Sequence, residues 1–175
     1  MEEYFDTYTR DGEFLGVKPK SFCHSKNADC YHKAVCAFLI NKKGELLIQK
    51  RASTKKNQPN KWASTSAGHV DAGEDVFKAI QRETFEEIGL NLSASEFVLE
   101  KVFTLDDSLE FMHLFFAKSD AKLSEIVIQK EEVSEVKWIS IKELERLMFS
   151  DDFVLIEDEF KFEVLNILKR YQEEI

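Results

Sequence analysis

Residues 68–90 read GHVDAGEDVFKAIQRETFEEIGL, a glycine-containing loop followed by a periodic segment. The periodic part predicts a helix of about four turns, and Gly89 follows it where helices often end in a left-handed residue. Three apolar side chains and one threonine recur at helical spacing: Phe77, Ile80, Thr84 and Ile88. The pattern therefore predicts a helix that packs one stripe against a core.

Three glutamates, Glu83, Glu86 and Glu87, occupy a neighbouring stripe of the same helix. Like charges at these spacings repel by roughly 0.2–0.5 kcal/mol per pair in isolated helices. One interpretation is an acidic face that simply contacts water, as charge runs usually do. The other is a site for a hard divalent cation such as Mg²⁺, which bridges carboxylates to substrate phosphates. The charge pattern alone does not decide between these two interpretations.

The spacing of eight residues resembles the signature of the Nudix hydrolase family: Gly68, Glu74, Arg82, Glu83, Glu86, Glu87, Gly89 and Leu90. One position departs, because Thr84 stands where the family usually has an aliphatic residue. Thr84 belongs to the buried stripe, so the departure concerns packing more than chemistry. The resemblance implies an α/β fold, the αβα sandwich with a mixed sheet.

The composition suits one soluble domain over residues 1–175, with a net charge of -9 that argues against nucleic acid as a partner. The acidic N-terminus has neither signal-peptide nor transit-peptide character. The longest apolar run, Ala34 to Ile40, is too short to span a bilayer, so no membrane partner is expected. An odd count of three cysteines without a CxxC pair is typical of reduced thiols in a cytoplasmic protein.

Residues 1–31 are predicted to form an N-terminal extension: a hairpin from Tyr4 to Val17 around Arg10-Asp11-Gly12, then an irregular segment. Alternating or continuous apolar runs predict strands at residues 32–40, 45–51, 97–105, 110–117 and 133–139. A capping box of Ser140 and Glu143 begins a helix over 141–148, and a last helix is predicted over 157–172. We expect the signature helix on one face of the sheet and the C-terminal helices on the other.

Five cations fall within twelve residues just before the signature: Lys50, Arg51, Lys55, Lys56 and Lys61. Lysine-rich loops are often merely solvated, but a cluster beside a metal helix also suits a phosphate clamp. Because the signature is adjacent, Arg51 and Lys55 are predicted to bind the substrate.

A further resemblance points to the branch that contains isopentenyl-diphosphate isomerase, and it rests on Gln49-Lys50-Arg51, Lys55-Lys56, Pro59, Trp62 and Ala67-Gly68-His69. That isomerase has a catalytic cysteine where this chain has Ala67, and a degraded glutamate signature where this chain has a complete one. Both differences favour hydrolysis over isomerisation. A third alternative, a ligand-binding module without catalysis, is disfavoured by the complete glutamate set.

The family resemblance implies that Glu83, Glu86 and Glu87, with the Gly68 carbonyl, hold Mg²⁺ or Mn²⁺. Arg82 would orient the glutamates, and the partner would be a small-molecule diphosphate. The general base stays open between a signature glutamate and four later carboxylates: Glu110, Glu131, Glu132 and Glu135. Trp62 or Phe103 would either stack on a base or pack in the core.

The isomerase resemblance implies a second metal site at His24, His32, His69 and Glu110, although each histidine could instead be structural. Substrate specificity is expected to lie in residues 18–31 and 106–110, which carry no readable motif. The sequence leaves the substrate open, and it leaves open whether the protein is a monomer or a homodimer.

Overall fold

The computed structural model describes residues 2–173, so residues 1, 174 and 175 of the predicted domain lie outside it. The strands are β1 Tyr4–Tyr8, β2 Phe14–Pro19, β3 Tyr31–Ile40, β4 Leu46–Arg51, β5 Trp62–Ala63, β6 Ser66–His69, β7 Val98–Leu105, β8 Glu110–Lys118 and β9 Val133–Ile139. The helices are α1 Lys20–Cys23, α2 Val76–Ile88, α3 Ile141–Met148 and α4 Asp158–Glu173, with 3₁₀ turns η1 Ala94–Glu96 and η2 Leu123–Glu125. None of these helices is long and apolar enough to cross a membrane.

Strand β3 is the centre of the sheet. Along one edge it pairs in parallel with β8, from His32 opposite Glu110 to Ile40 opposite Lys118. Along the other edge it pairs in turn with β1, β6 and β4, each antiparallel. The expected mixed sheet is confirmed, and its order is β2-β1-β3-β4-β5 with β6, β7, β8 and β9 branching from that path.

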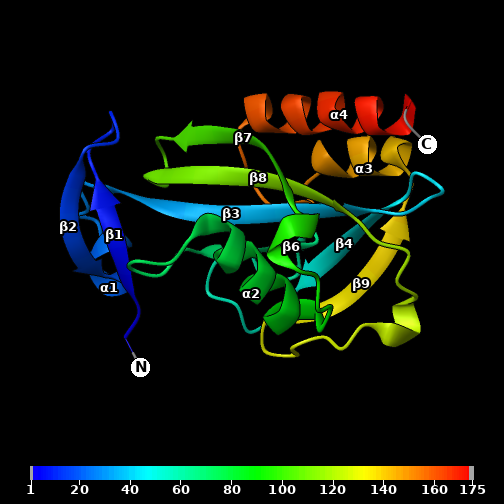
Figure 1. The fold of residues 1–175 in the computed structure, drawn as a ribbon, viewed down its shortest axis with the longest axis horizontal. Helices are drawn as coiled ribbons and strands as arrows, with labels where there is room; N and C mark the ends of the chain where they lie inside the picture. Colours follow the sequence, from blue (N-terminus) through cyan, green and yellow to red (C-terminus); the bar gives the residue numbers. More distant parts are fainter. Residues whose placement is uncertain (1, 174–175) are drawn as a thin grey trace.

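Helices cover both faces of this sheet, which confirms the predicted layers (Figure 1). One core cluster joins the face of β3 that carries Phe38 and Ile40 to α3 and α4. The other joins the opposite face, with Val35 and Leu39, to α2 through Ile80. This division follows from the strand period of two, which sends alternate side chains of β3 to opposite faces.

Most predicted elements are confirmed to within one residue, because long apolar or alternating runs mark them. Three elements were missed. Helix α1 lies in the segment predicted to be irregular and is a single turn of four residues, too short to show a helical period. Strand β5 has two residues, and β6 reads SAGH, which lacks the β-branched and aromatic residues typical of strands.

The three cysteines are free and buried, and Cys36 lies in the core. Trp62 and Phe103 are also buried in the core cluster beneath α3 and α4, which settles their role as packing residues. Phe103 packs on Phe160 of α4 with ring centroids 4.9 Å apart.

The ends of α2 are fixed by its own sequence. The Asp75 side chain accepts hydrogen bonds from the backbone N–H groups of Phe77 and Lys78 at the N-terminus. Gly89 adopts the left-handed conformation, with φ of 71°, and its N–H donates to the Phe85 carbonyl. The predicted glycine stop is therefore confirmed.

Thr84 has a polar partner that explains its place on the buried stripe. Its hydroxyl lies 2.7 Å from the Ser66 hydroxyl of β6, and neither residue is exposed to solvent. The hydrogen bond ties α2 to β6, and it would be lost with the aliphatic residue usual at this position.

We expect Thr84→Val to lower the free energy of unfolding by about 1–3 kcal/mol, because it leaves the buried Ser66 hydroxyl without a partner. Adding Ser66→Ala removes the stranded group, so the double variant should be more stable than Thr84→Val alone. Urea denaturation of the three variants and the wild type measures both effects. A double variant less stable than Thr84→Val would contradict this account.

Candidate active site

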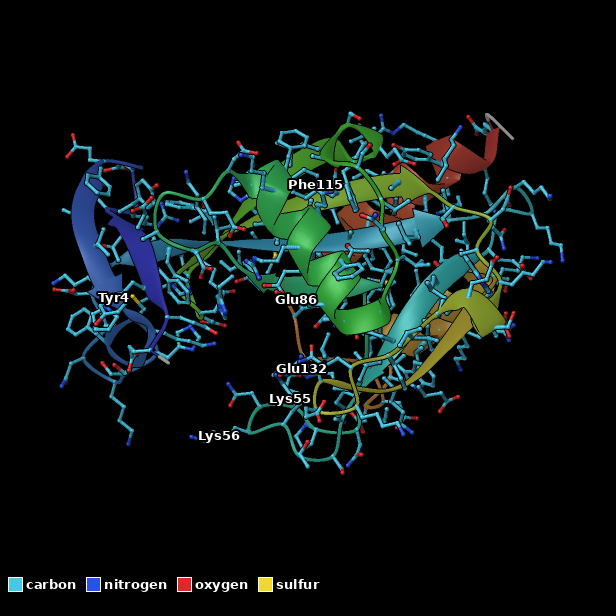
Figure 2. All side chains as sticks on the ribbon, turned by 60° about the horizontal axis from the view of Figure 1, so that its bottom comes forward. Tyr4, Lys55, Lys56, Glu86, Phe115 and Glu132 are labelled. Carbon is cyan, nitrogen blue, oxygen red and sulfur yellow. The ribbon has the colours of Figure 1, made fainter. Side chains whose placement is uncertain are left out.

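A cavity of about 430 Å³ opens beside α2. Its wall combines Glu83, Glu86, Glu87 and Arg82 of α2, Ala67, Gly68 and His69 of β6, Asp71 of the signature loop, Arg51 and Lys55, Gln129 and Glu132, and Glu3 and Lys20. Figure 2 shows Glu86 on α2 facing Lys55 and Glu132. The cavity therefore brings the signature carboxylates together with cations from a different part of the chain.

The acidic stripe of α2 is not a solvated face. Glu87 is 7% exposed and the Glu83 side chain is 15% exposed, whereas the Glu86 side chain is half exposed. Burial raises the pKa of Glu83 to about 7 and that of Glu87 to about 8, and the repulsion between the two carboxylates adds to the effect at Glu87. Such a site favours a cation that compensates the buried charge.

Glu87 is held by two donors that meet the same oxygen. The Ala67 backbone N–H lies 3.0 Å from its Oε2 atom, and the Gln49 Nε2 atom lies 2.8 Å from it. Both donors belong to strands of the sheet, so they fix the carboxylate relative to the fold rather than to its own helix.

Arg82 connects the carboxylates around the cavity. Its Nη1 atom lies 2.7 Å from Glu83 Oε1 and 3.3 Å from Glu86 Oε2. Its Nε and Nη2 atoms each donate to Glu74 at 2.9 Å, and Nη2 also donates to the His69 carbonyl. Burial opposes ionisation of Glu74, but hydrogen bonds from Arg82 and from the Asp71 N–H outweigh it and lower the pKa of Glu74.

Gly68 permits the close approach of Glu83 to the backbone of β6. A Cβ atom at this position would lie 2.1 Å from the carboxyl carbon of Glu83. Any other residue would therefore displace the carboxylate. Glycine is required here for space rather than for an unusual φ angle.

Two of the five predicted cations, Arg51 and Lys55, line the cavity. Lys55 forms an ion pair with Glu132, and Arg51 donates to the Asn57 carbonyl. The other three lie off the cavity wall: Lys50 stands over the Trp62 ring, Lys61 donates to the Asp151 carbonyl, and Lys56 extends away from the body of the protein in Figure 2. Of the five cations, the two that were predicted to bind the substrate are thus the two that line the cavity.

The N-terminal extension supplies two residues, one on each side of the hairpin, that sequence reasoning did not single out. Glu3 and Lys20 line the cavity and form an ion pair of 2.5 Å. The hairpin docks on the signature loop through backbone contacts, with the Ala72 N–H donating to the Tyr4 carbonyl. No sequence signal could have singled out Glu3 among 33 acidic residues, because the contact depends on this docking.

The predicted second cluster is assembled, since ligand atoms of His24, His32, His69 and Glu110 all lie within 4.8 Å of one another. Glu110 Oε1 lies 3.2 Å from His69 Nε2 and 3.6 Å from His32 Nε2. His32 is fully buried, and neither of its ring nitrogens has a hydrogen-bond partner. A structural histidine normally pairs such atoms, so the geometry favours a ligand over a packing role.

The surroundings of His24 keep its ring in the form that binds metals. Desolvation of the ring, in a residue that is otherwise exposed, and the neighbouring histidines lower the pKa of His24 to about 4, so the ring stays neutral at neutral pH. Phe5 of β1 stacks on His32 and His69, with centroid distances of 5.1 and 5.0 Å. The hairpin therefore covers the cluster with an apolar ring.

Comparisons with known proteins identify the family and the fold that the chain is similar to. The NUDIX domain family matches residues 31–158. Nudix hydrolase 3 of Arabidopsis thaliana is 32% identical over 165 residues, which cover 86% of this chain but 21% of that protein, so the chain spans about a fifth of its length. An isopentenyl-diphosphate Delta-isomerase of Streptomyces coelicolor is 34% identical over 149 residues, 82% of this chain and 74% of that protein. A Deinococcus radiodurans crystal structure shares the fold, with a TM-score of 0.73, 22% identity and coverage of 96% and 98%.

We expect the metal-free protein to lose stability as the pH rises. The raised pKa values of Glu83 and Glu87, about 7 and about 8, exceed the value of about 4.3 in an unfolded chain. The folded state keeps protons that the unfolded state releases, so this contribution is fully present below about pH 4.3 and is lost through about pH 7 to 8. Mg²⁺ should offset the loss, because it binds ionised carboxylates.

Calorimetry between about pH 5.5 and about pH 8.5, with and without Mg²⁺, measures this effect. Glu87→Gln is the control, since it removes one titrating group and should flatten the dependence of Tm on pH. A wild-type Tm with the same dependence on pH as that of Glu87→Gln would show that Glu87 keeps no extra proton in the folded protein.

Proposed function

Because the chain belongs to the Nudix family, we propose that it is a metal-dependent hydrolase that cleaves a phosphoanhydride bond in an organic diphosphate, with nucleoside diphosphate-linked compounds as one class. The observation that supports this proposal most directly is the cavity. Its wall contains the three signature glutamates together with Arg51 and Lys55. The cations would grip a diphosphate while the carboxylates hold its counter-ions.

The residues fit Mg²⁺ or Mn²⁺. Glu83 and Glu87 are carboxylates whose pKa values are raised by burial, and oxygen ligands are what these cations prefer. We assign Glu83, Glu86, Glu87 and the Gly68 carbonyl as the ligands. When bound, the metal supplies charge neutralisation at the anhydride oxygens and lowers the pKa of a coordinated water.

The protein's own residues do the remaining work. Arg82 links Glu83 and Glu86 through its Nη1 atom and so orients both carboxylates, and Arg51 and Lys55 orient the diphosphate. Water attacks phosphorus, and the bridging oxygen leaves with the bonding electron pair. Of the four later carboxylates considered as general base, Glu132 lies on the cavity wall and Glu110 lies in the histidine cluster, so we assign the base to Glu132.

Glu132 is paired with Lys55 in the ligand-free protein. An incoming diphosphate competes with Glu132 for the Lys55 ammonium, which releases the carboxylate to accept a proton from water. Substrate binding and activation of the base are therefore coupled through one lysine.

We also propose that His24, His32, His69 and Glu110 bind a second metal ion. Buried His32, whose Nε2 atom faces Glu110 at 3.6 Å without forming a hydrogen bond, supports this assignment. A set of three imidazoles and one carboxylate suits Mn²⁺, Zn²⁺ or Fe²⁺ better than Mg²⁺, which prefers oxygen ligands. The histidine site would thus differ from the glutamate site in metal preference.

Isomerisation of isopentenyl diphosphate is the second candidate function. Relatives carrying that name and the assembled histidine cluster favour it. Ala67 argues against it, because an alanine methyl cannot donate or accept a proton at the position of the isomerase cysteine. We also propose a cytoplasmic location, consistent with three free cysteines, and a monomer or homodimer.

The test is product release from a panel of diphosphates with Mg²⁺ and with Mn²⁺: nucleoside di- and triphosphates, nucleotide sugars, dinucleotides, thiamine diphosphate and isopentenyl diphosphate. We expect metal-dependent hydrolysis of one class, lowered at least about 100-fold by Glu83→Gln. Glu132→Gln should lower turnover while metal binding persists. Isomerisation without hydrolysis would refute the proposal, as would full activity in Glu83→Gln.

The histidine site has its own test. We expect His24→Ala to lose bound Mn²⁺ or Zn²⁺, measured by elemental analysis after gel filtration, because it removes one of four ligands. Since His24 is exposed, the fold should survive. Glu83→Gln is the matched control and should retain the histidine-bound metal. Equal metal content in His24→Ala and wild type would exclude this site.

A further inference from the structure

Gln49 is a buried polar residue that stability alone does not explain. It lies in β4, is 2% exposed, and its Oε1 atom is buried without a hydrogen-bond partner. Leaving a buried carbonyl oxygen unpaired costs roughly 1–3 kcal/mol. An apolar residue of similar length would avoid this cost, so the amide serves another purpose.

The amide nitrogen of Gln49 indicates what this purpose is. Its Nε2 atom donates to Glu87 Oε2 at 2.8 Å, from a strand rather than from the helix that carries Glu87. The Ala67 N–H meets the same oxygen, so the two known donors occupy Oε2 and leave Oε1 of Glu87 without a donor from either. Glu87 lines the cavity, whereas Gln49 is not part of its wall.

We propose that Gln49 is a positioning residue that holds Glu87 in the orientation that binds metal. This inference rests on the proposed function, because it requires Glu87 to be a ligand. Hydrogen bonds to ligating carboxylates typically change metal affinity by about 10–100-fold. Gln49 would act on the metal through Glu87 and would not touch the substrate.

Thr65 offers a matched control from the same region. It is fully buried, its hydroxyl donates to the Leu47 carbonyl, and it accepts from the Leu39 N–H at 2.9 Å. Both contacts are to backbone atoms of β3 and β4, and no signature residue is involved. A defect of general packing should therefore appear in Thr65→Val as much as in a Gln49 variant.

The experiment measures Mn²⁺ affinity without substrate, by titration calorimetry, in the wild type, Gln49→Met, Gln49→Leu, Thr65→Val and Glu87→Gln. Glu87→Gln identifies the component that belongs to the glutamate site. We expect both Gln49 variants to weaken that component by about 10–100-fold. Thr65→Val should lower Tm and leave that component unchanged. Neither methionine nor leucine can donate a hydrogen bond to Glu87, so Gln49→Leu stays informative if Gln49→Met folds poorly.

The possible outcomes distinguish a failure of the positioning role of Gln49 from a failure of the proposed glutamate metal site. Native Mn²⁺ affinity in both Gln49 variants would overturn the positioning role while leaving the glutamate site intact. An equal loss of affinity in Thr65→Val would also overturn it, because packing would then explain the effect. If no Mn²⁺ binding depends on Glu87 in the wild type, the proposed metal site falls together with this inference.

Discussion

The backbone pairing of β3 is the constraint on which both candidate metal sites depend. Its parallel partner β8 places Glu110 opposite His32, and its antiparallel partner β6 places His69 opposite Ala34 and Gly68 opposite Val35. A slip of one residue would send alternate side chains to the other face of the sheet. The histidine cluster and the glycine beneath Glu83 would be lost together, so strand register controls the chemistry.

Burial of the glutamates in the candidate site is electrostatically unfavourable. Folding buries Glu83 and Glu87 beside each other, which raises both pKa values and favours the protonated forms. Donors from three elements oppose this: Arg82 of α2, the Ala67 N–H of β6 and Gln49 of β4. The helix alone could not hold its carboxylates in this way, which is why the signature extends into the preceding loop and strand.

Features encoded by neighbouring residues could be predicted from the sequence, whereas contacts between residues far apart in the chain could not. The helix stop at Gly89 and the capping box at Ser140 are encoded within a few residues, and both were predicted correctly. The cap at Asp75 is equally local but was not predicted. The glutamate stripe needed only helical spacing and a resemblance. Gln49 belongs to a motif of the second resemblance, but its role could not be found in this way, and neither could Glu3 and Lys20. The contacts of all three join residues more than ten positions apart in the chain.

The N-terminal hairpin shows how a segment outside the matched domain can complete the site. Residues 31–158 carry the family match, yet Glu3 and Lys20 line the cavity and Phe5 stacks on two histidines of the second cluster. The hairpin is anchored at the signature loop by the Tyr4 carbonyl and the Asp6 carboxylate, which accept from Ala72 and Gly73. Because β1 carries Phe5 and follows Glu3 directly, a change in its docking would alter the cavity wall and the covering of the histidines together.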